Sequence, residues 1–288
     1  MKIISTKENL ISGLNIVGRL TGRNLQLPIL ANVLLKTEKG RLKMAATNLE
    51  IGITTYLGAE IKEEGGITVP GRVLIDYLSN LSANKIELTK EDNKLQIKSE
   101  GGKSTILGIE ETEFPLIPEV KEENPLILKS LELKDAILKT VFAAALDETR
   151  PVLTAVYFNL EKSGSKPLLK IVATDSFRLA ETSVFLEKEV NALQPLLIPA
   201  VTLMELARLI NEKTGDIILY FGENQAQFKT SQFSLVTRLL EGSFPDYQTI
   251  IPKEFKTNLI LEKEKFLGGL KLANLFARDA GGTLKLKV

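Results

Sequence analysis

The feature that most constrains this chain is an internal repeat, because segments of its first half return in the same order in its second half. The segment VATDSFRLAE at Val172–Glu181 has the same pattern of polar and apolar residues as AATNLEIGI at Ala45–Ile53. PVLTAVYF at Pro151–Phe158 likewise matches PILANVLL at Pro28–Leu35. Self-similarity on this scale indicates one structural unit that is built at least twice along the chain.

Each copy combines helical and strand patterns, which predicts an α+β fold. Ser5-Thr6-Lys7-Glu8 has the spacing of a capping box and predicts a first helix with Ser5 as its N-cap. A second helix is expected to begin near Pro70, and Pro199 is the counterpart of that proline in the second copy. Short alternating runs predict an antiparallel meander in each copy, at residues 85–89, 94–99 and 105–109 and again at 217–221, 227–230 and 233–239.

Residues Thr174–Arg178 predict a tight turn between two strands. An apolar run precedes the turn, and Asp175 is of a residue type that hydrogen-bonds the neighbouring backbone in turns. The segment Pro28–Leu35 and its counterpart Pro151–Phe158 are both expected to be strands.

A third copy of the unit begins near residue 253 and does not finish. Leu259–Leu261 predicts an opening strand, Phe266–Ala273 a weak helix interrupted by Gly268-Gly269, and Leu284–Val288 a further strand. So short a piece cannot bury a core of its own. The predicted domains are therefore 1–121, 122–252 and an incomplete third domain at 253–288, in a chain cut short.

Composition argues against catalysis. The 288 residues include no cysteine and no histidine, which removes thiolate chemistry, the commonest general base and the commonest metal ligand. The candidate carboxylates are Asp175 and the group Glu110, Glu111 and Glu113, which are interpreted as a turn residue and a solvated loop. No phosphate-binding loop or nucleophile motif accompanies them, so we expect no enzyme activity, no cofactor and no metal site.

The N-terminal segment, the length of the apolar runs and the net charge bear on where the protein works and on how it could bind nucleic acid. The N-terminal segment MKIISTKENL lacks the apolar core of a signal peptide, and no apolar run is long enough to span a membrane, so a cytoplasmic protein is expected. The formal net charge is +1 at pH 7. A protein that bound nucleic acid by neutralising many phosphates should be more basic. If this protein stays on DNA, something other than strong electrostatic attraction must keep it there.

Five segments together resemble the bacterial sliding clamp family, the beta subunits of DNA polymerase III: LPILANVLL, ATNLEIGI, VPGRVLIDYL, VATDSFRLAE and EGSFPDY. The resemblance covers essentially the whole chain. It implies repeated clamp domains, each with antiparallel sheets outside and two helices lining the inner face. It also implies a processivity factor whose three-domain subunits pair head to tail as a ring around duplex DNA. A closed ring can slide on weak phosphate contacts, which accounts for the near-neutral charge.

The resemblance and the polarity of the expected helices select basic residues that would face DNA. Those expected are Arg19, Arg23, Arg72, Lys134, Lys139, Arg150 and Arg208. Only Arg23 and Arg150 fall near family positions that carry over by motif. Each cation on its own could equally be a solvated surface residue.

The resemblance also implies a partner groove in the second domain, beside its boundary with the third. Such a groove accepts short extended peptides with apolar anchors, carried by polymerases, the clamp loader and repair proteins. Its residues would be Leu153, Thr174, Ser176, Phe177, Arg178, Leu179, Pro245, Thr249 and Ile250. Phe177 stands where the family has a smaller or polar residue, and Thr249 where a basic residue often occurs. The competing interpretation makes Leu153, Leu179 and Ile250 plain core residues.

The dimer interface of the family joins the first domain of one subunit to the third domain of the other. Here the strand around Ile106 would meet Leu275 and Phe276. With its third copy incomplete, this chain is expected not to close a stable ring, although a full-length subunit would form a homodimer. The alternative function is a stand-alone peptide-binding repeat protein that does not encircle DNA.

Overall fold

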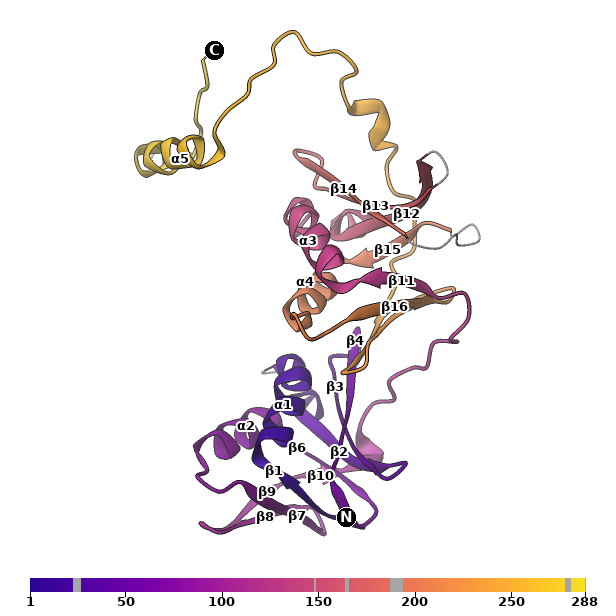
Figure 1. The fold of residues 1–288 in the computed structure, drawn as a ribbon, viewed down its shortest axis with the longest axis vertical. Helices are drawn as coiled ribbons and strands as arrows, with labels where there is room; N and C mark the ends of the chain where they lie inside the picture. Colours follow the sequence, from indigo (N-terminus) through magenta and orange to yellow (C-terminus); the bar gives the residue numbers. More distant parts are fainter. Residues whose placement is uncertain (23–26, 148, 164–165, 187–193, 278–280, 288) are drawn as a thin grey trace. The chain divides into compact units, whose positions relative to one another are not determined.

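The computed structural model describes residues 1–22, 27–147, 149–163, 166–186, 194–277 and 281–287. The chain forms two compact units, Met1–Phe244 and Pro245–Val288, and each is described by itself (Figure 1).

The first unit contains two similar series of elements; among the described residues, the second series has no counterpart of the short strands β5 and β10 of the first. The first series is β1 (Lys2–Thr6), α1 (Lys7–Val17), β2 (Asn32–Glu38), β3 (Arg41–Thr47), β4 (Ile51–Leu57), β5 (Glu60–Glu63), β6 (Gly66–Pro70), α2 (Gly71–Asn80), β7 (Lys85–Glu91), β8 (Lys94–Ser99), β9 (Gly102–Leu107) and β10 (Ile109–Glu110). The second series is β11 (Leu126–Lys129), α3 (Ser130–Thr140), β12 (Ala155–Ser163), β13 (Lys166–Thr174), β14 (Leu179–Phe185), β15 (Leu196–Pro199), α4 (Ala200–Leu209), β16 (Asp216–Phe221), β17 (Gln225–Lys229) and β18 (Ser234–Arg238). Strand β4 corresponds to β14 and β9 to β18, so the predicted repeat is confirmed in the order of its elements.

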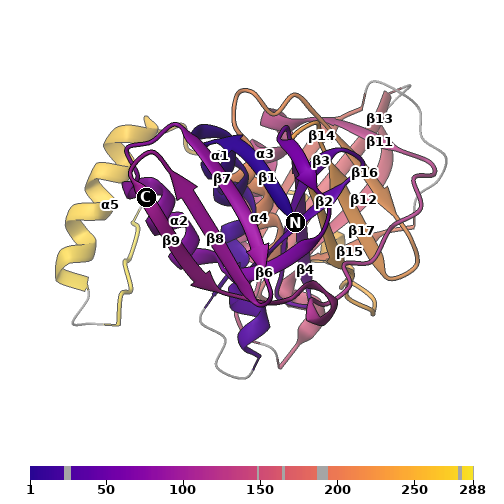
Figure 2. The same cartoon turned by 90° about the horizontal axis from the view of Figure 1, so that it is seen from below.

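Backbone pairing joins the two copies into one sheet. The strand order of this nine-stranded sheet is β10-β6-β2-β3-β4-β18-β17-β16-β11, and β4 and β18 run antiparallel where the copies meet. We call this pairing the β4–β18 junction. A five-stranded sheet, β5-β1-β7-β8-β9, belongs to the first copy and a four-stranded sheet, β14-β13-β12-β15, to the second. Figure 2 shows β7, β8 and β9 side by side. Strands β9 and β14 each lie at the edge of a sheet.

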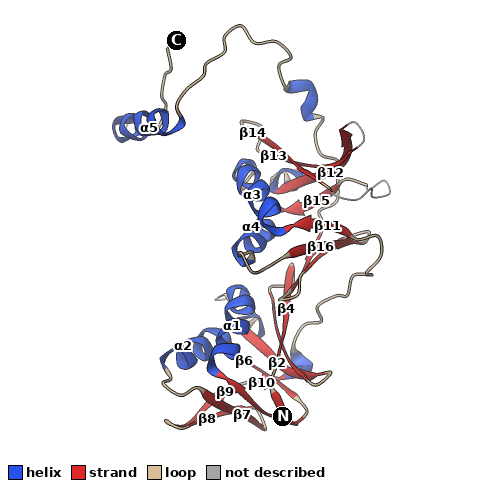
Figure 3. Ribbon diagram, in the orientation of Figure 1, coloured by secondary structure: helices blue, strands red, loops and turns tan. Residues whose placement is uncertain are grey.

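The helices bury one face each against the sheets. In α1 the buried residues recur at helical spacing, with Leu10, Leu14 and Val17 turned inward. A Cβ atom at Gly13 would lie 2.5 Å from Cδ1 of Leu57, so α1 approaches β4 closely. Helices α3 and α4 bury their own apolar stripes in the same way. All four helices lie on one side of the sheets (Figure 3).

A linker, residues 114–125, crosses the β4–β18 junction on its way from the first copy to the second. Phe114 packs with Leu34 and Ala45 of the first copy, and Val120 packs with Tyr220 and Val236 of the second. Between these contacts, Ile117 lies over Gly52 of β4. The linker therefore packs against both copies.

Two local predictions for the first unit are wrong. The N-cap of α1 is Thr6, whose Oγ1 accepts a hydrogen bond from the Asn9 N–H at 3.2 Å, because the pairing of β1 with β7 continues through Thr6 and the helix begins only at Lys7. The expected strand Pro28–Leu35 starts only at Asn32. Residues Pro28–Ala31 form a 3-10 turn, and Pro151–Thr154 form its counterpart. A proline at the first position suits a helical turn, since its fixed φ is compatible and its missing N–H is not needed there.

The second unit contains the 3-10 turn Tyr247–Ile250 and the helix α5 (Lys263–Ala277). The prediction that Gly268-Gly269 interrupts this helix is wrong, because glycine weakens a helix without breaking it and good helix formers flank the pair. The predicted strand Leu259–Leu261 is also wrong, since these residues have irregular backbone. Residues 284–287 are irregular as well, and Val288 lies outside the described residues. Across the described part of the chain, none of the helices has the length and apolar character needed to cross a membrane.

Candidate functional site

The turn between β13 and β14 is fixed by hydrogen bonds from its own side chains. Thr174 Oγ1 donates to the Arg178 carbonyl at 2.8 Å and accepts from the Ser176 N–H at 3.1 Å. Asp175 Oδ1 accepts from the N–H groups of Phe177 and Arg178 at 3.0 and 2.9 Å. Ser176 has a φ of 77°, in the left-handed region. The predicted bonding of Asp175 to its local backbone is therefore confirmed.

The first copy contains the same turn. Thr47 Oγ1 donates to the Ile51 carbonyl at 2.9 Å, and Asn48 Oδ1 accepts from the N–H groups of Glu50 and Ile51. Leu49 has the φ of 77° that Ser176 has in the second copy. Because Asn48 supplies an equivalent acceptor without a charge, the turn itself does not require the carboxylate of Asp175.

The charge of Asp175 acts on Arg178 instead. Asp175 Oδ2 accepts a hydrogen bond from Arg178 Nε at 3.0 Å. The backbone N–H groups of Arg178 and Phe177, together with the guanidinium of Arg178, hold the pKa of Asp175 below its usual value. The guanidinium also lies 5.8 Å from the ring centroid of Phe142, so Arg178 is oriented by a carboxylate and by an aromatic ring.

The surface around this turn combines aromatic and cationic groups. The side chain of Phe177 is 97% exposed, and Arg150 Nη1 donates to Ser176 Oγ at 3.3 Å. Phe142, in the 3-10 turn Val141–Ala143 that follows α3, is also exposed. Sequence reasoning missed Phe142, because its contact with Arg178 joins residues far apart in the sequence. The turn therefore offers apolar surface and hydrogen-bond donors side by side.

The predicted groove residues fall into two sets. Leu153 is buried, with 5% of its surface exposed, Thr174 is buried, and Leu179 is half-buried. Pro245, Thr249 and Ile250 belong to the second unit. Ile250 is 68% exposed and is therefore not a core residue there, and Thr249 Oγ1 donates to the Asp246 carbonyl at 2.8 Å. The structure places Thr174–Leu179 in one turn, and a hydrogen bond from Arg150 to Ser176 links that turn to the segment that leads to Leu153. The groove as a whole remains a prediction.

The cations expected to face DNA have different surroundings. Arg19 and Arg72 are exposed at the C-terminal end of α1 and in the first turn of α2. Lys134 Nζ donates to the Ile210 carbonyl at 2.7 Å and so ties α3 to the end of α4. The remaining described members of the set are engaged with other side chains: Lys139 with Asp135, Arg208 with Glu205 and Arg150 with Ser176. Arg23 lies outside the described residues.

The residues of the predicted dimer interface are divided between the two units. Ile106 is buried in β9, and the next residue, Leu107, is 70% exposed at the sheet edge. Leu275 and Phe276 are exposed on α5. Among the described residues, no three acidic side chains gather in a way that could hold a metal ion.

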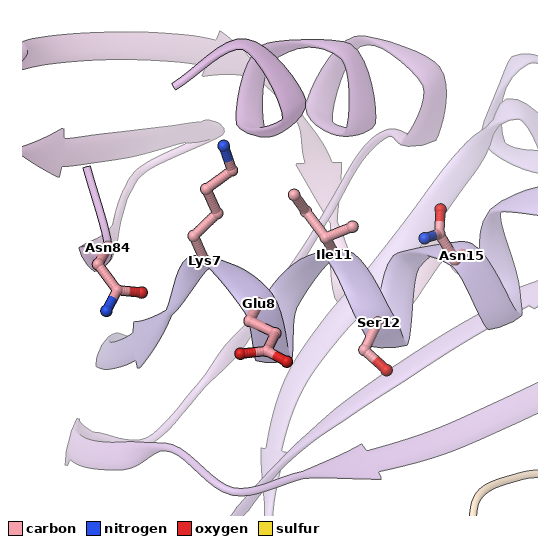
Figure 4. Close-up of a pocket in the computed structure, with 6 residues that line it drawn as sticks. All are labelled: Lys7, Glu8, Ile11, Ser12, Asn15 and Asn84. Atoms are coloured by element: carbon pink, nitrogen blue, oxygen red, sulfur yellow. The ribbon is translucent and has the colours of Figure 1, made fainter. Parts of the chain in front are cut away.

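Two hollows lie along α1, and sequence reasoning missed both. The first, of about 470 Å³, is lined by Lys7, Glu8, Ile11, Ser12, Asn15 and Asn84 (Figure 4). The second, of about 730 Å³, shares Ser12 and Asn15 with it and extends to the end of α4. Their linings come from elements far apart in the sequence, so no local motif indicates them.

Comparison with known proteins gives consistent matches along the chain. Residues 1–118 match the family model described as DNA polymerase III beta subunit, N-terminal domain, and residues 127–246 match the model of its central domain. The beta sliding clamp of Synechococcus elongatus is 30% identical over 295 residues, covering 100% of this chain and 77% of that protein. That of Halalkalibacterium halodurans is 30% identical over 290 residues, covering 97% of this chain and 75% of the relative.

Solved structures agree with these matches. The DNA polymerase sliding clamp of Bacillus subtilis is similar with a TM-score of 0.90 and 26% identity, over 96% of this chain and 74% of that one. The sliding clamp of Bartonella birtlesii, solved bound to griselimycin, gives a TM-score of 0.87 and 27% identity, over 94% and 73% of the two chains.

Proposed function

The chain belongs to the beta sliding clamp family of bacterial DNA polymerase III subunits, and we propose from this membership that it acts as a processivity factor that encircles duplex DNA. The observation that carries the proposal is the β4–β18 junction, which joins two copies edge to edge with all four helices on one side. Further copies joined in the same way would extend an arc whose helical side faces inward. Such a ring would stay on DNA without a strong electrostatic attraction.

We propose three domains for this arrangement, at 1–121, 122–252 and 253–288, the last only in part. In a full-length homodimer, the edge strand β9 around Ile106 would pair with the third domain of the partner, near Leu275 and Phe276. The exposed backbone edge of β9 supports this assignment. The cations of the helical side, Arg19 and Arg72 among them, would make weak, exchanging contacts with phosphates.

We further propose that the turn at Thr174–Leu179 forms one wall of a groove for short extended peptides. Replicative polymerase, clamp loader and repair proteins would bind through such peptides. The exposed ring of Phe177 and the oriented guanidinium of Arg178 suit an apolar anchor and a polar group that fixes the orientation of the peptide. We also keep Pro245, Thr249 and Ile250 as proposed peptide-binding residues.

We infer that the chain works without catalysis or cofactor and in the cytoplasm. The absence of histidine and cysteine from its sequence supports a binding role, and the family matches favour the clamp over a stand-alone peptide-binding repeat protein.

Retention on circular DNA tests encirclement. The protein is extended at its C-terminus by the region of a relative that lies beyond the match, loaded onto nicked circular duplex, and the DNA is then cut once. We expect retention before the cut and loss after it, because a ring slides off a free end. Equal retention on circular and linear DNA would eliminate encirclement. An Arg178→Ala variant should keep this retention while its peptide binding is weakened, which separates the two roles.

A further inference from the structure

The β4–β18 junction is a thin connection between the two copies. Among the described strands, only β4 and β18 pair across it. Four residue pairs make up this pairing, within Ile51–Thr54 and Ser234–Thr237. Beyond them, Thr55 Oγ1 donates a hydrogen bond to the Gln232 carbonyl at 2.6 Å. So short a strand pair resists bending weakly, and the groups that lie on its two faces decide how stiff the junction is.

On the helix side, the junction lies beside the hollow of about 730 Å³ described above. Ser12 and Arg19 line this hollow from the first copy, and Arg208 and Lys213 line it from the second. The hollow leaves room for the copies to bend toward each other on the side of the helices.

The linker lies on the opposite face of the nine-stranded sheet. Successive residues of a strand point to opposite faces. Leu235 of β18 belongs to the main hydrophobic core, which the helices cover, whereas its neighbour Val236 packs with Val120 of the linker. In β4, Ile117 of the linker lies over Gly52. The linker therefore crosses the junction on the face that points away from the helices.

Side chains hold the linker in place. Within the described part of the chain, residues 115–125 make no hydrogen bonds between backbone groups. Phe114 is buried on the first copy and Val120 on the second. Glu122 also pairs with Lys229 of β17, but an exposed ion pair of this kind adds little. The linker thus has one buried apolar anchor on each copy.

We propose that the linker is a strap that limits bending of the β4–β18 junction toward the helices. Bending in this direction closes the hollow and moves apart the two places where Phe114 and Val120 are buried. The segment 115–120 that joins these places can span only ~20 Å, because an extended chain covers at most ~3.3–3.6 Å per residue. The length of this segment then sets how far the junction bends. The proposal does not rest on the proposed function, since it concerns the protein without DNA.

The test lengthens the strap without removing a contact. Gly-Gly-Gly is inserted between Pro118 and Glu119, which are both exposed and lie between the two anchors. The same insertion between Glu122 and Glu123, which are exposed and lie beyond the second anchor, is the matched control. Exposed segments without backbone hydrogen bonds tolerate insertions of this size, and circular dichroism checks that both proteins are folded.

Spin labels on the two sides of the hollow report the bend. The sequence contains no cysteine, so Ser12→Cys and Lys213→Cys provide the label sites without further changes. Both residues are exposed, and they line the hollow from different copies. Double electron–electron resonance then gives the distribution of distances between the two labels, in the absence of DNA.

We expect the wild type and the control insertion to share one distance distribution. The insertion between the anchors supplies up to about 10 Å of slack, so its distribution should gain distances several ångströms shorter. Val120→Ser, which releases the second anchor at unchanged length, should add the same short distances. An unchanged distribution in either variant would overturn the strap, as would an equal effect of both insertions. A shift to longer distances would overturn the direction of bending.

These outcomes are separate from those of the retention assay on circular DNA. A strap without encirclement would leave the proposal in place and refute the proposed function, whereas encirclement with unchanged label distances would do the reverse.

Discussion

Gly52→Ala places a methyl group at the point where the linker crosses the β4–β18 junction. The added Cβ would lie 2.6 Å from Cγ2 and 3.0 Å from Cγ1 of Ile117, closer than carbon atoms pack. Relief requires Ile117 to move, and overpacking of this kind costs about 1–3 kcal/mol. Replacing a glycine in a strand by alanine also stabilises the protein by about 0.5–1 kcal/mol, because alanine lowers the conformational entropy of the unfolded chain. The expected net loss of stability is therefore about 1 kcal/mol.

A double-mutant cycle isolates this contact. Ile117→Ala removes a half-buried side chain and should cost about 1–2 kcal/mol, less than a fully buried isoleucine. In that background the new methyl group at position 52 has room, so Gly52→Ala should become neutral or slightly stabilising. The expected coupling is about 1–2 kcal/mol. Urea unfolding of the four proteins, followed by circular dichroism, provides the free energies.

Gly58→Ala is the matched control, because a Cβ there would meet nothing within 4 Å. It should leave stability unchanged or slightly raised. Additive effects at positions 52 and 117 would refute the contact as described, since the two substitutions would then act independently.

Three further predictions concern the turn and the first helix. Thr6→Ala should lower the free energy of unfolding by about 1 kcal/mol through loss of the N-cap, whereas Ser5→Ala should not remove that cap; comparable urea midpoints for Thr6→Ala and the wild type would contradict this. Arg178→Ala should weaken binding of a labelled clamp-binding peptide about tenfold, because one charge-assisted hydrogen bond to the peptide is lost. Unchanged dissociation constants in anisotropy titrations would show that Arg178 is not part of the proposed groove. Asp175→Asn should keep the turn and lose the charge. Because the folded-state pKa of Asp175 is lowered, its stabilising effect is present above its unfolded pKa and is lost as the pH falls through the folded value. The thermal midpoints of variant and wild type should therefore differ at neutral pH and converge in acid. A difference that stays constant with pH would contradict the link between protonation of Asp175 and stability.

Features fixed by neighbouring residues were predictable from the sequence. The bonding of Asp175 is one example, because the acceptor and its donors are two or three residues apart. The repeat was predictable as well, since it rests on the order of many short patterns. Leu10 and Leu14 likewise indicated the buried face of α1 by their spacing.

Features set by distant partners were not predictable. The capping-box spacing favours Ser5, but β1 stays paired with β7 through Thr6, so the helix begins at Lys7 and Thr6 is the cap. At Gly268-Gly269 the helix continues because the cost of each glycine, about 1 kcal/mol, does not end it. The hollow of about 730 Å³ beside α1 combines Arg19 with Arg208 and Lys213, which belong to different copies and are far apart in the sequence.

Two of the edge strands of the first unit, β14 and β9, are of different kinds. At the β4–β18 junction, a strand of the β4 type pairs with a strand of the β18 type, and the chain exposes one counterpart of each, β14 and β9. An association that reused this pairing would be directional, with β14 of one molecule meeting β9 of the next. A heterologous contact leaves one edge unused at each end, so further molecules can always be added. The angle between successive copies then decides whether a closed ring or an open filament forms. The number of copies in an assembly is then a property of curvature, set by how the sheets twist at each junction.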